Sequence, residues 1–346
     1  MATDPRSLEP AAAGAAGGTL IDASLEGELT KVKARGYWEQ VWIRFKRDRV
    51  AVASIFFIVL LVVACFPGAW LASKLLGHGP NTLFFDGVDE RLTPVGPWSY
   101  VTNPNTLERD LLVLGADGSL GRDEFLRLLY GGRVSLQVAV FSTIGAMSLG
   151  VLLGAVAGYY RGWIDTVISR VIEITMAFPA LLFIIALAST VGSRLDNVTF
   201  GIFAQGVFTL VLVFTVFGWF YPARIIRAQV LSLREKEFVE AARMIGASDA
   251  RIIRSHLLPH LVAPIIVYST LIVAGYILGE AGLSFLNLGI KLPTASWGNL
   301  LASAPEYYTA QPWLMLWPGL AVLLTTLAFN LLGDGLRDAF DPRSTH

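Results

Sequence analysis

The sequence predicts an all-α integral membrane protein with six transmembrane helices and an extracytoplasmic insert between the first two. Hydrophobic residues make up 54% of the 346 positions and charged residues only 16%, whereas soluble domains carry about 25% charged residues. The apolar residues form long runs, and the remaining sequence is too short to enclose them in a charged shell. A soluble enzyme is therefore excluded. The equal numbers of basic and acidic residues, 27 of each, argue against a nucleic-acid binder.

The six spans are recognised by the absence of charge. A helix needs about 20 apolar residues to cross a hydrocarbon core about 30 Å thick. Six stretches without Asp, Glu, Lys or Arg are long enough, namely residues 50–73, 134–160, 174–193, 197–223, 257–279 and 307–333. Pro179 lies in the third and can kink it. The single cysteine, Cys65, lies in the first and is expected to face lipid or to be packed, since one cysteine cannot form an intramolecular disulfide.

Positive charge sets the predicted orientation. Seven basic residues precede the first span, which are Lys31, Lys33, Arg35, Arg44, Lys46, Arg47 and Arg49. Residues 224–258 carry seven more, and the short loops on the other side carry only Arg194 and Lys291. Cytoplasmic loops are enriched in Lys and Arg, while long loops such as 74–133 translocate largely regardless of charge. Both termini are therefore predicted to be cytoplasmic, with residues 1–30 as a flexible tail, 31–73 as a lead-in and first helix, and 336–346 as a second tail.

Residues 74–133 are predicted to form a small folded insert on the extracytoplasmic side, with turn signals at 77–81, 94–97 and 103–105. The Asp117-Gly118 pair can turn a hairpin between residues 111–114 and Leu120. Three acidic residues of this region, Asp117, Asp123 and Glu124, lack the alternating spacing of a calcium loop. We expect them to be solvated turn residues.

The cytoplasmic segment 224–258 has the pattern of a helical hairpin. A helix over residues 234–245 would place four apolar residues on one face in the manner of a docking stripe, namely Phe238, Ala241, Ala242 and Ile245. Gly246 ends this helix, and Ser248 can cap the next one, which continues to Pro259 where the chain re-enters the bilayer. A loop that only connected two spans would not need such a design.

Four stretches resemble a known family. Glu240-Ala241-Ala242 with Gly246 and Leu258-Pro259 resembles the EAA loop of permease subunits from binding-protein-dependent ABC importers. The other three resemble the C-type permease of dipeptide or oligopeptide importers: Gly121-Arg122-Asp123 with residues 130–136, Glu280 to Leu286 with Gly289 and Ser296-Trp297-Gly298, and Asn330 to Asp338 with Asp341-Pro342-Arg343. The resemblance covers residues 40–343. Two departures are Asn287, where the branch usually has glycine, and a longer insert before Gly121.

The resemblance implies the type I ABC importer permease fold, with five of the six helices in a permease core of residues 134–335. It implies half of a translocation pore in a bacterial-type cytoplasmic membrane, paired with a second homologous permease, two ATPase subunits and an extracytoplasmic substrate-binding protein. ATP and Mg would be bound by the ATPase subunits, because this chain has no G-x-x-x-x-G-K-[ST] loop to bind phosphates. We expect the chain to be no enzyme and to bind no cofactor or metal.

The resemblance also assigns site residues. The ATPase-coupling set is Glu240, Ala241, Ala242, Gly246, Leu258 and Pro259. The family-motif or gate candidates are Arg122, Asp123, Arg133, Glu280, Trp297, Asp334, Arg337 and Asp338. Glu280 either lines the outer gate or bonds a neighbouring helix end. Other charges near the membrane are expected to form local ion pairs. Arg170 and Glu173 are expected to pair at i,i+3, and Asp338 to pair with Arg337 or Arg343 at the inner surface.

Several alternatives stay open at this point. Related importers also carry nickel chelates and oligosaccharides. A secondary transporter would normally place ionisable residues in mid-span, and the first, second, fourth and sixth spans have none. An intramembrane hydrolase needs a nucleophile and a base buried together, and neither His256 nor His260 has a plausible serine partner deep in a span. These two histidines also lack the carboxylate or cysteine partners of a metal site.

Overall fold

The computed structural model describes residues 36–177, 179, 182–187, 190 and 206–341. The chain divides into two units, residues 1–44 and 45–346. The described part of the first belongs mainly to α2 (Tyr37–Arg47), an amphipathic helix. The predicted tail 1–30, Arg194, Arg343 and parts of the third and fourth predicted spans lie outside the described residues.

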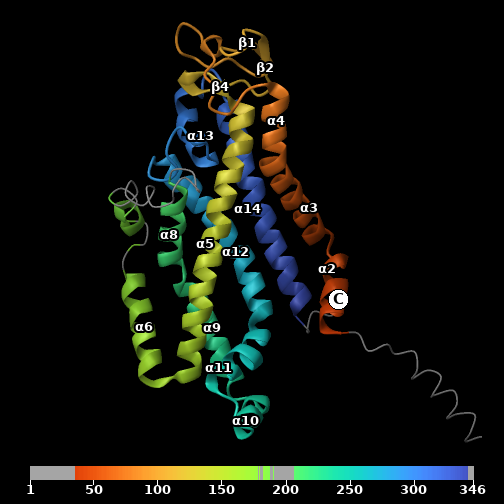
Figure 1. Ribbon diagram of the computed structural model, residues 1–346, viewed down its shortest axis with the longest axis vertical. Helices are drawn as coiled ribbons and strands as arrows, with labels where there is room; N and C mark the ends of the chain where they lie inside the picture. The colour runs from red at the N-terminus through yellow and green to blue at the C-terminus, as the bar shows by residue number, and fades with distance from the viewer. Residues whose placement is uncertain (1–35, 178, 180–181, 188–189, 191–205, 342–346) are drawn as a thin grey trace, which may run out of the picture. The chain divides into compact units, whose positions relative to one another are not determined.

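The second unit is built from long helices (Figure 1). Five helical stretches within the described residues are long and apolar enough to cross a bilayer, namely Arg49–Leu76, Glu124–Tyr160, Val207–Leu233, Asp249–Phe285 and Trp313–Phe340. Their helices are α3 (Arg49–Val63), α4 (Ala69–Leu76), α5 (Glu124–Tyr160), α8 (Val207–Gly218), α9 (Phe220–Leu233), α11 (Asp249–Arg251), α12 (Leu258–Phe285) and α14 (Trp313–Phe340). The others are α6 (Gly162–Ala177), α10 (Glu237–Met244) and α13 (Trp297–Ser303). The predicted helical membrane class is confirmed.

The first span is a bent helix. Asp48 caps α3, and its side chain accepts hydrogen bonds from the amides of Val50 (2.9 Å) and Ala51 (3.1 Å). A π-helical turn, Ala64–Gly68, joins α3 to α4 and contains Pro67, which lacks the amide that a regular helix needs there. Cys65 in this turn is buried, in agreement with the packed reading of that residue.

Helix α5 is the centre of the unit, with α8, α9, α12 and α13 packed against it. Gly150, Gly154 and Gly158 form a stripe at i,i+4 spacing that faces α9. A Cβ on Gly154 would lie 2.5 Å from the carbonyl oxygen of Ala223, so only glycine permits this distance between the two backbones. Such small-residue stripes replace the hydrophobic effect as a source of helix association in lipid.

Several helix ends differ from the predicted span ends. Helix α9 continues ten residues past the predicted end at Ala223, α14 begins at Trp313 and continues to Phe340, and α5 begins at Glu124 within the predicted insert. The absence of charge locates the hydrocarbon layer, whereas a helix ends only where its backbone hydrogen bonds end. Arginine is a good helix former and keeps its charge in water through its long side chain. Charged turns therefore extend the helices beyond the bilayer.

The insert between α4 and α5 is small and contains two antiparallel strand pairs. Strand β1 (Ser99–Thr102) pairs with β2 (Arg109–Leu112), and β3 (Ala116–Asp117) pairs with β4 (Arg122–Asp123). The predicted pairing of residues 111–114 with Leu120 is wrong, although the chain does turn after Asp117. Gly115, in the left-handed region with φ +90°, separates β2 from β3. Strand β2 therefore pairs with β1, which precedes it in the chain.

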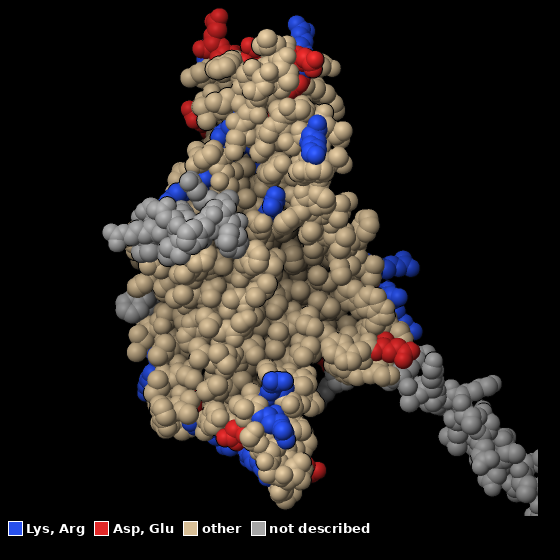
Figure 2. Space-filling model, in the orientation of Figure 1, with Lys and Arg blue, Asp and Glu red and all other residues tan. Residues whose placement is uncertain are grey.

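Charge is confined to particular regions of the surface. On the face shown in Figure 2, acidic side chains gather over the insert and near the opposite end, and the broad middle is largely uncharged. Many apolar residues of the first span are exposed on the surface of the unit, and Phe56 is 70% exposed. A protein in water would bury such residues, so this surface is suited to lipid or to another membrane subunit.

The departure at position 287 has a backbone explanation. Asn287 follows the last turn of α12 with φ +60°. The amide of Leu288 donates to the carbonyl of Leu283 at 2.8 Å, and that of Asn287 donates to Ser284 at 3.0 Å. This is the Schellman arrangement, in which glycine is usual and asparagine is the residue that best replaces it.

We expect Asn287→Gly to change the free energy of unfolding by less than about 1 kcal/mol, and Asn287→Val to lower it by about 1–2 kcal/mol, because a β-branched residue is strained at positive φ. Thermal unfolding of the purified protein measures both. Leu286→Val is the matched control, since Leu286 is exposed and has φ −81°. Equal tolerance of valine at 286 and 287 would contradict this explanation.

Candidate functional site

The three acidic residues predicted to be solvated, Asp117, Asp123 and Glu124, are buried, so that prediction is wrong. Asp117 is 2% exposed, Asp123 is fully buried and Glu124 is 1% exposed. Asp117 accepts a hydrogen bond from Arg122 at 3.0 Å and forms an ion pair with Arg127. The sequence pattern showed charges next to turn residues, and nothing local in it indicates that distant segments cover them.

Arg127 joins three parts of the chain. Besides its ion pair with Asp117, it donates to the side chain of Asn81 (3.0 Å) and to the carbonyl of Pro293 (3.2 Å). Ser303 of α13 donates to Asp117 at 3.4 Å. The cluster therefore fastens the insert to α5 and to the segment between α12 and α13. Removing one partner of such a buried pair is costly because the other charge is left without compensation.

His78 holds the insert against the first turn of α5. Its ring is fully buried, with Nδ1 2.8 Å from the carboxylate of Asp110 and Nε2 2.9 Å from that of Asp123. Asp123 is also the N-cap of α5, accepting from the amides of Phe125 and Leu126. Burial alone would lower the pKa of His78, but the hydrogen bonds and charges of Asp123 and Asp110 outweigh it and raise the pKa above its usual value.

Glu280 connects α12 to α5. It is fully buried, and its carboxylate accepts hydrogen bonds from Ser135 of α5 (2.6 Å) and from Ser284 (2.6 Å). The hydroxyl of Ser135 in turn accepts from the backbone amide of Trp297 at 3.3 Å. This network, called the Glu280 network below, brings together residues from two of the motif stretches and α5. In the structure Glu280 bonds a neighbouring helix.

Trp297 closes the same region. Its ring nitrogen donates to the carbonyl of Leu128 at 3.0 Å, and the side chain is 1% exposed. A Cβ on Gly132 would lie 2.7 Å from the Trp297 ring, which explains why a glycine stands at that place in the motif around residues 130–136. The motif residues therefore fit one another by shape as well as by hydrogen bonds.

The other gate candidates lie apart from this network. Arg133 is exposed and its guanidinium lies 5.6 Å from the ring centre of Phe66. Asp334, Arg337 and Asp338 are exposed on the last turns of α14. The predicted Arg170–Glu173 pair is confirmed at 2.8 Å, and both side chains are largely exposed, so it stabilises the helix only weakly.

The predicted hairpin is present, with α10 and α11 separated by Gly246. Gly246 has φ +81°, its amide donates to Arg243, and the amide of Ala247 donates to Ala242. These two bonds form a Schellman motif that ends α10 as predicted. Ser248 stands at the N-cap of α11, without a side-chain capping bond.

The predicted docking stripe of the hairpin is partly wrong. Ala242 is buried and Phe238 is half-buried, with its ring centre 5.0 Å from that of His260. The buried face of α10 is Val239 with Ala242, because α10 packs on the core formed by α5, α9 and α12. The exposed face contains Ala241, Met244 (83% exposed) and Ile245 (84% exposed).

The predicted coupling residues therefore divide into two groups. Glu240, Ala241 and Gly246 are exposed near the end of the hairpin, and Pro259 is exposed in the first turn of α12. Ala242 and Leu258 pack into the core beneath them. We call Ala241, Met244, Ile245 and Gly246 the hairpin tip.

Tyr159, which the sequence did not single out, anchors the hairpin to α5. Its hydroxyl donates to Asp249 at 2.7 Å, its carbonyl accepts from Arg234, and the guanidinium of Arg243 lies 5.4 Å from its ring centre. Its side chain also packs in the core shared by α5, α9 and α10. A tyrosine at the end of a span usually indicates an interfacial anchor. The sequence therefore contained no specific indication that Tyr159 contacts the hairpin.

Comparison with known proteins agrees with this architecture. A family model described as "Binding-protein-dependent transport system inner membrane component" matches residues 150–346, and one described as "N-terminal TM domain of oligopeptide transport permease C" matches residues 36–91. The chain belongs to this family of ABC importer permeases. The resemblance predicted from the EAA loop is thereby confirmed, and the permease is a multi-pass inner-membrane protein.

Curated relatives match most of the permease. It is 44% identical to the dipeptide transport system permease protein DppC of Alkalihalophilus pseudofirmus, over 88% of this chain and 90% of the relative. It is 37% identical to the glutathione transport system permease protein GsiD of Pectobacterium atrosepticum, over 88% of this chain and 91% of the relative. A solved structure of the MetNI methionine ABC transporter in inward-facing conformations gives a TM-score of 0.46 at 17% identity, over 62% of this chain and 96% of that one.

Another ion pair that the sequence did not indicate joins α6 to α9 in the permease. Arg227 donates to both carboxylate oxygens of Asp165, at 2.5 and 2.7 Å. The Arg227 guanidinium lowers the pKa of Asp165 below its usual value. Arg227 lies in the segment 224–258 that was predicted as the coupling hairpin, and its partner Asp165 is 62 residues away in the sequence, so no local pattern indicated the pair.

The insert of the permease should lose stability as the pH rises. Because the pKa of folded His78 lies above its unfolded value of about 6.5, the stabilisation is complete below that pH and disappears as the pH rises through the folded pKa. The thermal unfolding temperature of wild type should therefore fall above about pH 6.5. His78→Gln should have lower stability at acidic pH and a smaller fall. Identical pH profiles for the two proteins would show that His78 is not the titrating group.

Loss of the Tyr159 hydroxyl should loosen the hairpin. Tyr159→Phe removes the hydrogen bond to Asp249 and keeps the ring, and a hydrogen bond to a charged group contributes about 1.5–3 kcal/mol. We expect amide hydrogen exchange over residues 237–257 to become at least about tenfold faster. Tyr160→Phe is the control, because Tyr160 is exposed. Equal exchange rates in the two variants would exclude the anchoring role.

Proposed function

We propose that this permease forms half of the translocation pore of an ATP-driven importer for dipeptides or oligopeptides. The observation that carries the substrate class is the 44% identity to a permease named for dipeptide transport, over nine-tenths of that relative. The partners in this proposal are a second homologous permease, two ATPase subunits that bind ATP and Mg, and an extracytoplasmic substrate-binding protein. The reported relatives favour neither nickel chelates nor oligosaccharides as the substrate, and they do not favour a secondary transporter.

The hairpin tip is the surface that we assign to ATPase coupling. Met244 and Ile245 are more than four-fifths exposed, which is costly for apolar side chains in water and is typical of a surface that another protein covers. Glu240 lies beside them and can form charge-assisted contacts at the rim. A groove on an ATPase subunit would bury the tip, and the EAA motif lies at the right place for this contact.

Movement of the tip would reach the pore helices through Tyr159. The core below α10 and the contacts of Tyr159 join the hairpin to the end of α5. At its other end, α5 carries Ser135 of the Glu280 network and the Asp123 cap bonded to His78. A displacement of the hairpin would therefore move a helix that contacts both the cytoplasmic hairpin and the outer segments. We assign Glu280 to positioning of the outer gate on this basis.

Substitution at Gly246 tests the function and the coupling together. Any residue with a Cβ is strained at φ +81°, although no neighbour lies within 4 Å of the added atom. Gly246→Val should therefore shift the tip by altering the Schellman motif, at a cost of about 1–2 kcal/mol, and leave membrane insertion intact. In proteoliposomes of the complete complex, wild type should accumulate a labelled dipeptide only with ATP, and Gly246→Val should uncouple ATP hydrolysis from uptake.

Two results would contradict the proposal in different ways. If neither ATPase activity nor a second permease co-purifies with the wild-type chain, the proposed importer assembly is contradicted. Normal uptake by Gly246→Val would leave the importer intact and remove the coupling role of the tip. Ser248→Val, two residues further at a position with ordinary φ, is the matched control for the valine side chain.

The orientation is a separate proposal, with the insert outside and both termini inside the cell. Leu107 in the insert is 80% exposed, and Met244 at the hairpin tip is 83% exposed. In a Cys65→Ser background, a cysteine introduced at 107 should react with a membrane-impermeant maleimide in intact spheroplasts, and one at 244 should react only after permeabilisation. The reverse pattern would overturn the orientation. Asp117 is unsuitable for this purpose because it is buried.

A further inference from the structure

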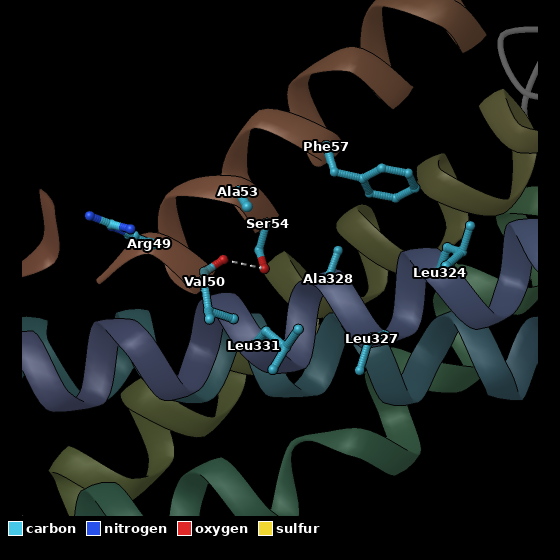
Figure 3. Close-up of a pocket in the computed structure, with 9 residues that line it drawn as sticks. All are labelled: Arg49, Val50, Ala53, Ser54, Phe57, Leu324, Leu327, Ala328 and Leu331. Atoms are coloured by element: carbon cyan, nitrogen blue, oxygen red, sulfur yellow. Dashed lines mark hydrogen bonds between the residues drawn. The ribbon is translucent and has the colours of Figure 1, made fainter. Parts of the chain in front are cut away.

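A groove on the outer surface of the second unit lies between α3 and α14 (Figure 3). It encloses about 360 Å³ and is lined almost entirely by apolar groups, among them Val50, Ala53, Phe57, Leu324 and Leu327. The only hydroxyl in its wall, that of Ser54, donates to the carbonyl of Val50 at 2.9 Å. Apart from the charged group of Arg49 at one end, no group in the wall needs water, and the groove suits a hydrocarbon chain.

The length of the groove matches one leaflet of a bilayer. Its lining on α3 extends from Arg49 to Phe57, eight residues that rise about 12 Å along a helix. Half of a hydrocarbon core about 30 Å thick is about 15 Å. An acyl chain that enters beside Arg49 would therefore end near the bilayer midplane, where Phe57 and Leu324 lie at the far end of the groove (Figure 3).

Arg49 is the charged residue at one end of the groove. In Figure 3 the Arg49 side chain extends beyond the groove, past Val50. Within the part of the chain that the structure describes, neither Arg49 nor Arg47 forms an ion pair. The nearby carboxylate of Asp48 is turned to the amides of Val50 and Ala51. An anion at this end would therefore meet the guanidinium group of Arg49, while Asp48 already occupies the helix N-terminus.

The chain before α3 has the composition of a membrane interface. Helix α2 ends one residue before Asp48 and exposes Tyr37, Trp38 and Trp42, each more than half exposed. Tryptophan and tyrosine beside basic residues are typical of the headgroup region. Arg49 follows α2 by two residues, so a headgroup depth for α2 would bring Arg49 to the level of lipid phosphates. The proposed orientation puts it in the cytoplasmic leaflet, where anionic lipids are abundant.

We propose that the groove between α3 and α14 binds one acyl chain of an anionic phospholipid whose phosphate contacts Arg49. The acyl chain fills the apolar wall over the depth of one leaflet, and the charged headgroup selects anionic over zwitterionic lipid. The bound lipid extends the contact between α3 and α14, where Ala51 already packs on Gly335. The first span is thereby held on the last span by a lipid as well as by protein contacts.

Lipid retention by the purified complex tests this site. The complex is reconstituted in equimolar phosphatidylglycerol and phosphatidylcholine, extracted in mild detergent, and its bound lipids are counted by native mass spectrometry. Wild type should retain phosphatidylglycerol preferentially, and Arg49→Gln should reduce that retention about fivefold, the effect of one basic residue near a membrane. Lys74→Gln, on the same span at its other end and stacked on Trp70, should leave it unchanged. Ala53→Phe, which fills the groove, should remove the lipid while keeping Arg49.

Three outcomes would overturn the site. They are equal retention of the two lipids by wild type, equal losses in Arg49→Gln and Lys74→Gln, or cross-linking of a cysteine at 53 to a second permease chain, which would mean that protein covers the groove. A Cys65→Ser background keeps that cross-link specific. The counted lipid does not depend on the substrate or on ATP, so failure of this proposal and failure of the proposed importer function are distinguishable.

Discussion

The packing of α5 against α8, α9 and α12 is the contact on which the rest of the described structure depends. Lipid supplies no hydrophobic drive for helices to associate, so close approach of backbones and buried hydrogen bonds must do so. The glycine stripe facing α9 gives the first, and the Glu280 network gives the second. Because both ends of α5 carry polar contacts to other segments, one helix links the hairpin of α10 and α11 to the insert between α4 and α5.

Several buried charges of this apolar chain hold separate segments together. Asp117 holds two arginines, His78 lies between two carboxylates, and Glu280 accepts from two serine hydroxyls. Leaving any of these groups alone in a dry environment is costly, so each network fixes the relative position of the segments that contribute to it. The insert is held on α5 chiefly in this way, since its own apolar core of Phe84, Val101, Leu112 and Ala116 is small.

Local features of the structure could be predicted from the sequence, and long-range partners could not. Runs without charge located the spans, and Gly246 located the end of α10, because both depend on neighbouring residues only. The burial of Asp117 depends on Arg127 and Ser303, which are far along the chain or on another helix. The same is true of Tyr159 and Asp249, ninety residues apart. Periodicity showed that α10 has an apolar face, but the choice between Val239 and Ala241 for the core depended on how α10 meets α12.

The hairpin and its support have the properties that mechanical coupling requires. Its tip is apolar and exposed, while its base is buried in a core shared with α5, α9 and α12. Coupling requires rigid connections within the hairpin and between the hairpin and α5, because a flexible connection would absorb a displacement before it reached α5. The Schellman bonds at Gly246 fix the joint inside the hairpin, and the contacts of Tyr159 fix the joint to α5. In the coupling that we propose, a push on the tip is carried as movement of α5, and the Glu280 network, which contacts α12 and Trp297, passes it on.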